Sequence, residues 1–269
     1  SAGNALRLTG EKRYSDFLHD TSAALRTRYN EKAGVICSWN SDKNKGTGFF
    51  GSQCLVIVDN MMNLELLETV AGMTGRKEYD TIARTHANTT MKNHFRDDFS
   101  TFHAVIYDEG SGEVTRKQTV QGYADSSMWS RGQAWGLYGY TMMFRFTRDS
   151  SYLEQACRIA HLLIPKLPED GIPFWDYDDP ARLSTVFTSN DVRNPDFCPR
   201  DASAAAVMAS ALLELAGYAD GEDSRLFRST AEKQIRSLAS PAYLCKKGEC
   251  HGFILKHSTG HRKRHIEVD

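Results

Sequence analysis

Apolar residues along the chain recur with the spacing of a helix face, on both sides of short polar turns. Leu64, Leu67, Val70 and Ala71, for example, would lie on one side of a helix. The same order of apolar helix end, turn with Gly, Asp or Ser, and second helix occurs four times. The copies read LRLTGEKRYSDFLHDTSAAL, AGMTGRKEYDTIARTHANTT, FRFTRDSSYLEQACRIAHLL and AGYADGEDSRLFRSTAEKQI, with second helices that begin around Tyr14, Tyr79, Tyr152 and Leu226. This self-similarity predicts a repeating helical architecture.

The repeat favours an all-α fold. Because the turns are short, the two helices of each copy must lie antiparallel. Helical hairpins joined by long connections predict an α/α toroid of the six-hairpin barrel type, in which connections at one end build a pocket. A solenoid of stacked hairpins is the alternative, although its repeats are usually shorter and more even. Strand signals are confined to GVICSW (34–39) and FHAVIYDE (102–109), and no Pro-rich linker divides residues 1–269.

Composition narrows the function classes. The chain is 41% hydrophobic with a formal net charge of −1, which is typical of an ordinary globular protein. It has no basic excess of the kind that marks nucleic-acid binders, and its apolar runs are too short for a membrane span. We therefore expect neither nucleic acid nor a membrane as a partner. The oligomeric state stays open, and so does the compartment, for which the cytoplasm and the periplasm are both options.

The six cysteines show no CxxC motif. Only Cys245 and Cys250 are close in sequence, and His251 follows them directly. A zinc site would need tighter and repeated ligand spacing. We therefore expect a surface hairpin or buried thiols, and no metal.

Two residues stand in surroundings that suit catalysis or packing. Asp59 lies in the apolar run CLVIVDNMMNLELLETV, where an ionised carboxylate is costly to bury. It is either the N-cap of the following helix or a carboxyl with a raised pKa, which general acid catalysis requires. His103, in FSTFHAVIYDE, is either a packing residue or a ligand-binding residue.

The segment QGYADSSMWSRGQAWGLYGY (121–140) predicts either a packing helix or a sugar site. Arg131 and Trp135 are spaced i, i+4 and therefore share one helix face. Arginine offers a planar fork of donors to a carboxylate, and tryptophan offers a flat apolar surface to a sugar ring. Gly132 and Gly136 would allow a ligand or a helix to approach closely. Trp129 should point away from Arg131 into the core.

Three further segments contain candidate residues, with Trp175 as a candidate for the rim of a pocket. Trp175 and the adjoining Asp176 precede a polar loop that ends in proline. Asp201 opens an alanine-rich helix and is expected to cap it, with small side chains that permit tight packing. The tail LKHSTGHRKRHIEVD concentrates positive charge at Lys256, His257, His261, Arg262, Lys263, Arg264 and His265. It is either a solvated face or a contact for an anionic substrate, with Lys256 and His257 as rim candidates.

Several motifs, in this order, resemble the unsaturated glucuronyl hydrolases, glycoside hydrolase family 88. They are DNMMNLELL, TFH, QGYADSSMWSRGQAWGLYGY, FWDYDDP and PRDASAAAVMASALLEL. The resemblance implies an α/α toroid, Asp59 as catalytic acid/base, and a substrate-binding set of His103, Gln121, Arg131 and Trp135. Related rhamnogalacturonyl hydrolases carry RGNGW where this chain has RGQAW, so Gln133 and Ala134 favour the glucuronyl branch.

The implied activity is release of 4,5-unsaturated glucuronic acid from the non-reducing end of lyase-generated, glycosaminoglycan-type oligosaccharides, by hydration of the vinyl ether without a cofactor. The alternatives are an unsaturated rhamnogalacturonyl hydrolase, a non-catalytic sugar-binding α/α protein and a helical scaffold for protein partners. The family's second essential aspartate lies in an HHDLGF-like motif upstream of the segment that SAGNALRLTG matches. The resemblance thus implies that residues 1–269 are a fragment, lacking N- and C-terminal parts, of a single α/α-barrel catalytic domain.

Overall fold

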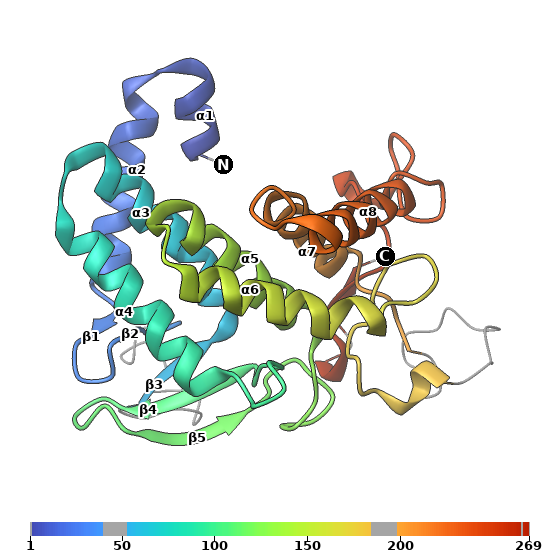
Figure 1. Cartoon of the computed structure of the whole chain (residues 1–269), viewed down its shortest axis with the longest axis horizontal. Coiled ribbons are helices and arrows are strands. Elements are labelled where there is room, and N and C mark those ends of the chain that lie inside the picture. The colour runs from blue at the N-terminus through green and yellow to red at the C-terminus, as the bar shows by residue number, and fades with distance from the viewer. Residues whose placement is uncertain (1, 40–52, 184–197, 265, 269) are drawn as a thin grey trace. The chain divides into compact units, whose positions relative to one another are not determined.

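The computed structural model describes residues 2–39, 53–183, 198–264 and 266–268 (Figure 1). Its long helices form the four hairpins expected from the repeat. They are α1 (Ala2–Thr9) with α2 (Lys12–Arg26), α3 (Leu64–Thr74) with α4 (Lys77–His94), α5 (Ser130–Thr147) with α6 (Ser150–Leu163), and α7 (Ala202–Leu215) with α8 (Gly221–Leu238). Short 3-10 helices are η2 (Val58–Asn63), η3 (Ile164–Lys166), η4 (Pro180–Leu183), η5 (Cys250–Gly252) and η6 (Arg262–Arg264).

The chain divides into two compact units, which we describe separately. The first unit comprises residues 1–94 and 104–117, and the second comprises residues 95–103 and 118–269. Hairpins α1–α2 and α3–α4 belong to the first unit, and hairpins α5–α6 and α7–α8 belong to the second. The single catalytic domain expected over residues 1–269 stays a prediction.

Two small antiparallel sheets accompany the helices of the first unit. One pairs β1 (Tyr29–Asn30) with β2 (Val35–Ile36), and the other has the order β3 (Gln53–Ile57), β4 (Ala104–Asp108), β5 (Val114–Gln118). Both segments with strand signals are therefore confirmed at β2 and β4. Strand β3 was not predicted, because a short continuous apolar run fits a buried helix as well as a strand. Seven buried residues from these sheets and their turns form one core: Ala33, Val35, Cys37, Cys54, Val56, Val105 and Tyr107.

In the second unit, α5 packs against α6 and α7, and α7 packs against α8. Five of the six alanines of α7 are buried and Ala206 is partly buried, as expected for a helix that packs closely. On α5, a Cβ added to Gly136 would lie 3.2 Å from the Phe95 ring, so this glycine admits a neighbouring side chain. A two-stranded sheet of β6 (Ser258–His261) and β7 (Ile266–Val268) completes the unit, and β6 packs on α7.

Disulfides link four of the six cysteines. Cys245 and Cys250 are paired, so the alternative of buried thiols is wrong for them, and a second, unpredicted disulfide joins Cys37 to Cys54. Among the residues that the structure describes, no group of three or more His, Cys, Asp or Glu side chains is suited to holding a metal ion. None of the described helices combines the length and apolar character needed to cross a membrane.

Candidate functional site

Asp59 lies in the first unit, just after β3. It is the second residue of η2, whose N-cap is Ile57, whereas the N-cap of α3 is Asn63. The prediction that Asp59 is the N-cap of the following helix is therefore wrong. The apolar run instead divides into a strand, a 3-10 turn and then α3, with Asp59 at the junction. Asp59 is 8% exposed and therefore counts among the buried polar residues of the first unit.

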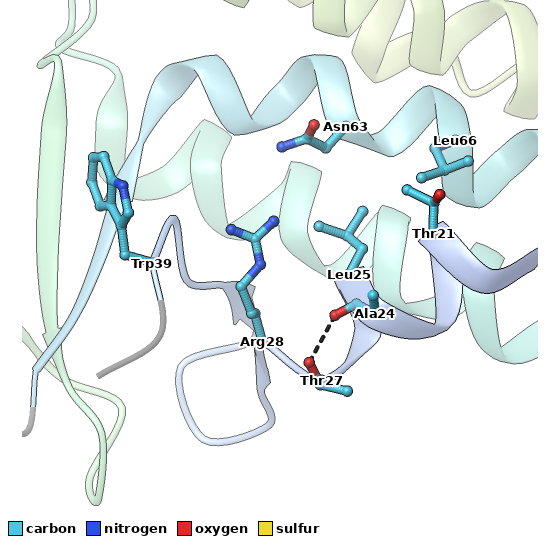
Figure 2. A pocket seen from close by; sticks show the side chains of 8 residues that line it. All are labelled: Thr21, Ala24, Leu25, Thr27, Arg28, Trp39, Asn63 and Leu66. Carbon is cyan, nitrogen blue, oxygen red and sulfur yellow. Dashed lines mark hydrogen bonds between the residues drawn. The ribbon is translucent and has the colours of Figure 1, made fainter. Parts of the chain in front are cut away.

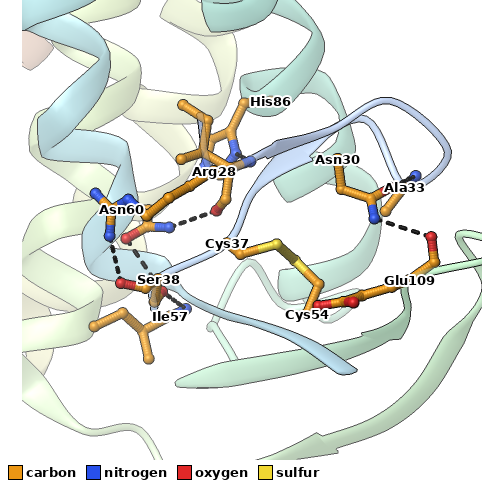
Figure 3. The surroundings of a disulfide bond; sticks show 11 residues. Arg28, Asn30, Ala33, Cys37, Ser38, Cys54, Ile57, Asn60, His86 and Glu109 are labelled. Carbon is orange, nitrogen blue, oxygen red and sulfur yellow. Dashed lines mark hydrogen bonds between the residues drawn. A yellow bond between two sulfur atoms is a disulfide. The ribbon is translucent and has the colours of Figure 1, made fainter. Parts of the chain in front are cut away.

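Hydrogen bonds fix the backbone on both sides of Asp59 (Figure 3). The Asn60 side chain donates from Nδ2 to the Ile36 carbonyl at 2.7 Å. The Ile57 amide donates to the Ser38 hydroxyl at 2.9 Å, and that hydroxyl contacts Asn60 Oδ1 at 3.2 Å. Arg28 donates in turn to the Ser38 carbonyl. The segment that carries Asp59 is thus tied to the strand β2 and to the residues that follow it.

Two fully buried histidines on α4 hold the same strands. His86 Nδ1 accepts from the Ile36 amide at 2.9 Å, whereas His94 Nε2 donates to the Val56 carbonyl at 3.1 Å. Burial lowers the pKa of His86 to about 3 and that of His94 to about 4, so both rings are neutral near pH 7. The Cys37–Cys54 disulfide adds a covalent link between the end of β2 and β3 (Figure 3).

The first unit also has an open cavity of about 470 Å³, between α2 and the start of α3 (Figure 2). Its lining residues are Thr21, Ala24, Leu25, Thr27, Arg28, Trp39, Asn63 and Leu66. The Trp39 side chain is 46% exposed, and burial lowers the pKa of Arg28. None of the residues predicted for the site lines this cavity, and sequence reasoning singled out neither Arg28 nor Trp39.

In the second unit, three of the predicted substrate-binding residues are joined by contacts. His103 is 3% exposed, and its Nδ1 accepts from the backbone amides of Val120 at 3.2 Å and Gln121 at 3.1 Å. Because an amide can only donate, Nδ1 carries no proton and the ring hydrogen lies on Nε2. The His103 ring stacks on Trp129, with centroids 4.2 Å apart.

Arg131 closes these contacts into a ring. Its guanidinium carbon lies 4.8 Å from the centre of the Trp129 ring. Its Nη2 donates to the Gly260 carbonyl at 3.1 Å, and the same carbonyl accepts from Gln121 Nε2 at 2.9 Å. His103, Trp129, Arg131, Gly260 and Gln121 therefore form a closed ring of contacts, which we call the arginine ring. Trp129 is buried, as predicted, but its expected direction away from Arg131 is wrong.

Asp201 anchors the arginine ring from α7. Its Oδ2 lies 3.0 Å from Arg131 Nη1, and its Oδ1 accepts from the amides of Ser203 and Ala204. The predicted N-cap is therefore confirmed. Asp201 is fully buried, which raises its pKa, while Arg131 and the amide donors oppose that shift. Sequence reasoning missed the ion pair because Asp201 has an evident local role as a cap.

Gln133 has a structural role beside the arginine ring. It is 1% exposed, and its Oε1 accepts from the Thr101 amide at 2.9 Å. Its Nε2 donates to the Thr101 hydroxyl at 3.0 Å and to the Thr101 carbonyl at 3.2 Å. Since Thr101 lies two residues before His103, the glutamine of RGQAW holds the TFH segment in place.

The remaining candidates lie in varied surroundings. Trp135 is half-buried on α5 and meets the Tyr138 ring edge-on at 5.8 Å. Trp175 is 2% exposed and donates to Asp179 at 2.7 Å, so its predicted position at an exposed rim is wrong. It packs with Trp129 as part of the core. Asp176 is also fully buried, where it accepts from the Ser127 hydroxyl at 2.7 Å.

The basic tail has a mixed character. Lys256 donates to the Pro241 carbonyl at 3.2 Å, and His257 is half-buried with its ring against Tyr243. The Thr259 and Gly260 carbonyls accept hydrogen bonds from Arg131. This part of the tail therefore holds the arginine side chain and is not a solvated face. His265 lies outside the described residues.

The chain has relatives among known proteins. No family model matches the chain. It is 42% identical to an unsaturated glucuronyl hydrolase of Formosa agariphila, over 95% of the chain and 59% of the relative. It is 33% identical to the enzyme of that name from Bacillus sp. (strain GL1), over 89% of the chain and 59% of the relative. The chain thus spans 59% of the length of these curated relatives.

Solved structures extend the comparison. An unsaturated glucuronyl hydrolase described as specific for heparin matches with a TM-score of 0.86 and 44% identity, over 100% of this chain and 67% of that one. The Bacillus sp. GL1 structure, described as responsible for glycosaminoglycan degradation, matches with a TM-score of 0.85 and 28% identity, over the same shares. These similarities confirm the all-α fold class of the α/α-toroid type that the hairpins predicted.

Proposed function

Because the chain belongs to the unsaturated glucuronyl hydrolase family, we propose that it releases 4,5-unsaturated glucuronic acid from the non-reducing end of glycosaminoglycan-type oligosaccharides. The observation that carries this proposal is the arginine ring, which joins three of the residues expected to bind the uronate. Relatives named unsaturated chondroitin disaccharide hydrolase, and the structure described as specific for heparin, support this substrate class.

The arginine ring suits a carboxylated sugar. Arg131 is 15% exposed and holds a full positive charge that can pair with the uronate carboxylate. Trp135, one helical turn further along α5 and half-buried, offers an apolar face to the sugar ring. His103 carries its ring hydrogen on Nε2, because its Nδ1 accepts from two backbone amides. Gln121, which lies in the loop whose backbone amides donate to His103, also binds the substrate in this proposal.

Asp59 performs the proton transfers in this proposal. In its protonated form it donates a proton to C4 of the vinyl ether, which leaves oxocarbenium character at C5. Water then attacks C5 and returns a proton to Asp59. The resulting hemiketal opens, and the bond to the neighbouring sugar breaks. The separation rule for paired glycosidase carboxylates does not apply to this hydration, since no displacement occurs at the anomeric carbon.

The test uses the loss of absorbance from the conjugated double bond of unsaturated chondroitin, heparin and pectin disaccharides. We expect the protein that carries this chain to consume the first two, and Asp59→Asn to lower turnover by roughly 100- to 10,000-fold with an unchanged fold. Asp108→Asn, at the half-buried end of β4, is the matched control and should behave as the wild type. Near-normal turnover by Asp59→Asn would remove Asp59 from the mechanism. Consumption of the pectin disaccharide alone would move the proposal to the rhamnogalacturonyl class.

A further inference from the structure

We propose that Asp201 is a positioning residue that turns the guanidinium of Arg131 so that one defined edge is left for the substrate carboxylate. This inference rests on the proposed function. It concerns a residue that touches Arg131 rather than the sugar.

The N–H donors of the Arg131 guanidinium are only partly occupied by acceptors of the protein. A guanidinium carries five N–H donors, two on each Nη and one on Nε. Nη1 faces three acceptors, Asp201 Oδ2 at 3.0 Å, the Ser203 hydroxyl at 3.0 Å and the Thr259 carbonyl at 2.8 Å. Nη2 donates to the Gly260 carbonyl at 3.1 Å. One Nη2 hydrogen and the Nε hydrogen remain, and no acceptor within the described part of the chain takes them.

In the proposal, the Gly260 carbonyl takes the Nη2 hydrogen on the Nη1 side, and the two remaining hydrogens bind the carboxylate through two parallel hydrogen bonds. The protein contacts therefore occupy the Nη1 side and leave the Nε–Nη2 side. Of the groups on the Nη1 side, only Asp201 is charged. The carbonyls and the hydroxyl would accept from a guanidinium in other rotations as well, whereas a fixed carboxylate strongly favours the one in which Nη1 faces it.

The surroundings of Asp201 make it a rigid reference point. Its side chain is fully buried and its Oδ1 accepts from two amides at the start of α7, which leaves Oδ2 for Arg131. On the opposite side, the Arg131 guanidinium lies against the Trp129 ring. A carboxylate held by a helix terminus and a buried indole together restrict the guanidinium in both direction and tilt.

The experiment compares Asp201→Asn with Asp149→Asn. Asparagine keeps a capping oxygen in both, since Asp149 caps α6 by accepting from the Ser151 amide at 3.0 Å. Two substrates are used, an unsaturated chondroitin disaccharide and its methyl ester at the uronate carboxyl. We expect Asp201→Asn to raise KM for the carboxylate by roughly 10- to 100-fold, with little change in kcat and no change for the ester. Asp149→Asn should change neither value.

A measurement without substrate separates this inference from the proposed function. In the wild type, hydrogen bonds should slow rotation of the Arg131 Nη groups and give resolved Nη–H signals in NMR spectra, assigned through Arg131→Lys. Asp201→Asn should average these signals, and Asp149→Asn should keep them. Ser203→Ala, which leaves Asp201 intact, should weaken carboxylate binding in the same direction but less.

Equal losses on acid and ester, or Nη–H signals that persist in Asp201→Asn, would overturn the positioning role. If the wild type consumes no uronide while the Nη–H signals respond as expected, the proposed function fails and Asp201 still orients Arg131.

Discussion

Asp59 and Arg131 are held in place by different means. In the first unit, the segment of Asp59 is fixed by its backbone, through strand pairing, amide and carbonyl contacts to buried side chains, and the Cys37–Cys54 disulfide. In the second unit, Arg131 is held through its side chain, by groups that lie about 70 and 130 residues further along the chain. We therefore expect the backbone frame to tolerate the loss of one contact better than the side-chain network does.

This difference follows from what each residue is proposed to do. A proton donor needs a fixed location for its carboxyl carbon, which a rigid backbone supplies. A carboxylate-binding arginine needs a fixed rotation at the end of a long flexible side chain, which only contacts with the guanidinium can supply. The predictions that follow act on these two kinds of support.

The largest effect on stability should come from Arg131→Ala. This change leaves Asp201 buried without its cation, and removing one partner of a buried pair costs about 3–5 kcal/mol. Urea denaturation near pH 7 measures the loss. The double variant Arg131→Ala, Asp201→Asn also removes the unpaired buried charge and should recover part of the lost stability. If the double variant is no more stable than Arg131→Ala, the ion pair is not what supports this region.

Arg131 and its contacts also show which features could be predicted from the sequence and which could not. The helical hairpins were predictable because the same apolar spacing returned four times, and Arg131 with Trp135 stood out as a donor and an aromatic surface on one helix face. The partner of Arg131 was not predictable, because Asp201 lies 70 residues away and its place before a helix already explained it as a cap. Contacts between distant segments leave no periodic trace in a single sequence.

The errors have the same origin. Trp175 was expected at a rim because its segment reads as a polar loop, yet its indole is buried where Asp179 satisfies its N–H. Strand β3 was hidden in an apolar run that is equally typical of a buried helix. Cys37 and Cys54 pair across 17 residues with no motif around them. In each case the structure depends on a partner that is distant in sequence, and the local sequence pattern does not identify that partner.

A smaller effect is expected from the disulfide of the first unit. Cys37→Ala with Cys54→Ala opens a link across 17 residues and should cost about 3 kcal/mol, by the loop-length model of disulfide stabilisation. Cys245→Ala with Cys250→Ala, a link across 5 residues, is the matched control and should cost about 2 kcal/mol. Urea denaturation of both variants gives the comparison. Equal losses in the two variants would contradict this dependence on loop length.

The smallest effect should be a gain, from Glu68→Gln on α3. Like Asp201, Glu68 is a buried carboxyl at 5% exposure, but its nearest cation, Arg84, pairs with Asp80 at 2.7 Å. Burial, followed by the charge of Asp80, raises the pKa of Glu68 to about 7 from its ordinary 4.5. The folded protein therefore favours the protonated form, and its stability falls as the pH rises from about 4.5 to about 7.

Glutamine stays neutral throughout, so Glu68→Gln should stabilise the protein near pH 8 and leave it unchanged near pH 4. The gain should be smaller than the roughly 3 kcal/mol that the full pKa difference represents, because solvent screens part of the charge. Urea denaturation at both pH values measures the difference, and Glu154→Gln on the exposed face of α6 controls for the loss of one negative charge. A gain of the same size at both pH values would show that the side chain packs better as an amide and that its charge is irrelevant. A gain confined to high pH would show that the ionised carboxyl of Glu68 costs stability. Asp201 in the second unit differs, because it pairs with Arg131.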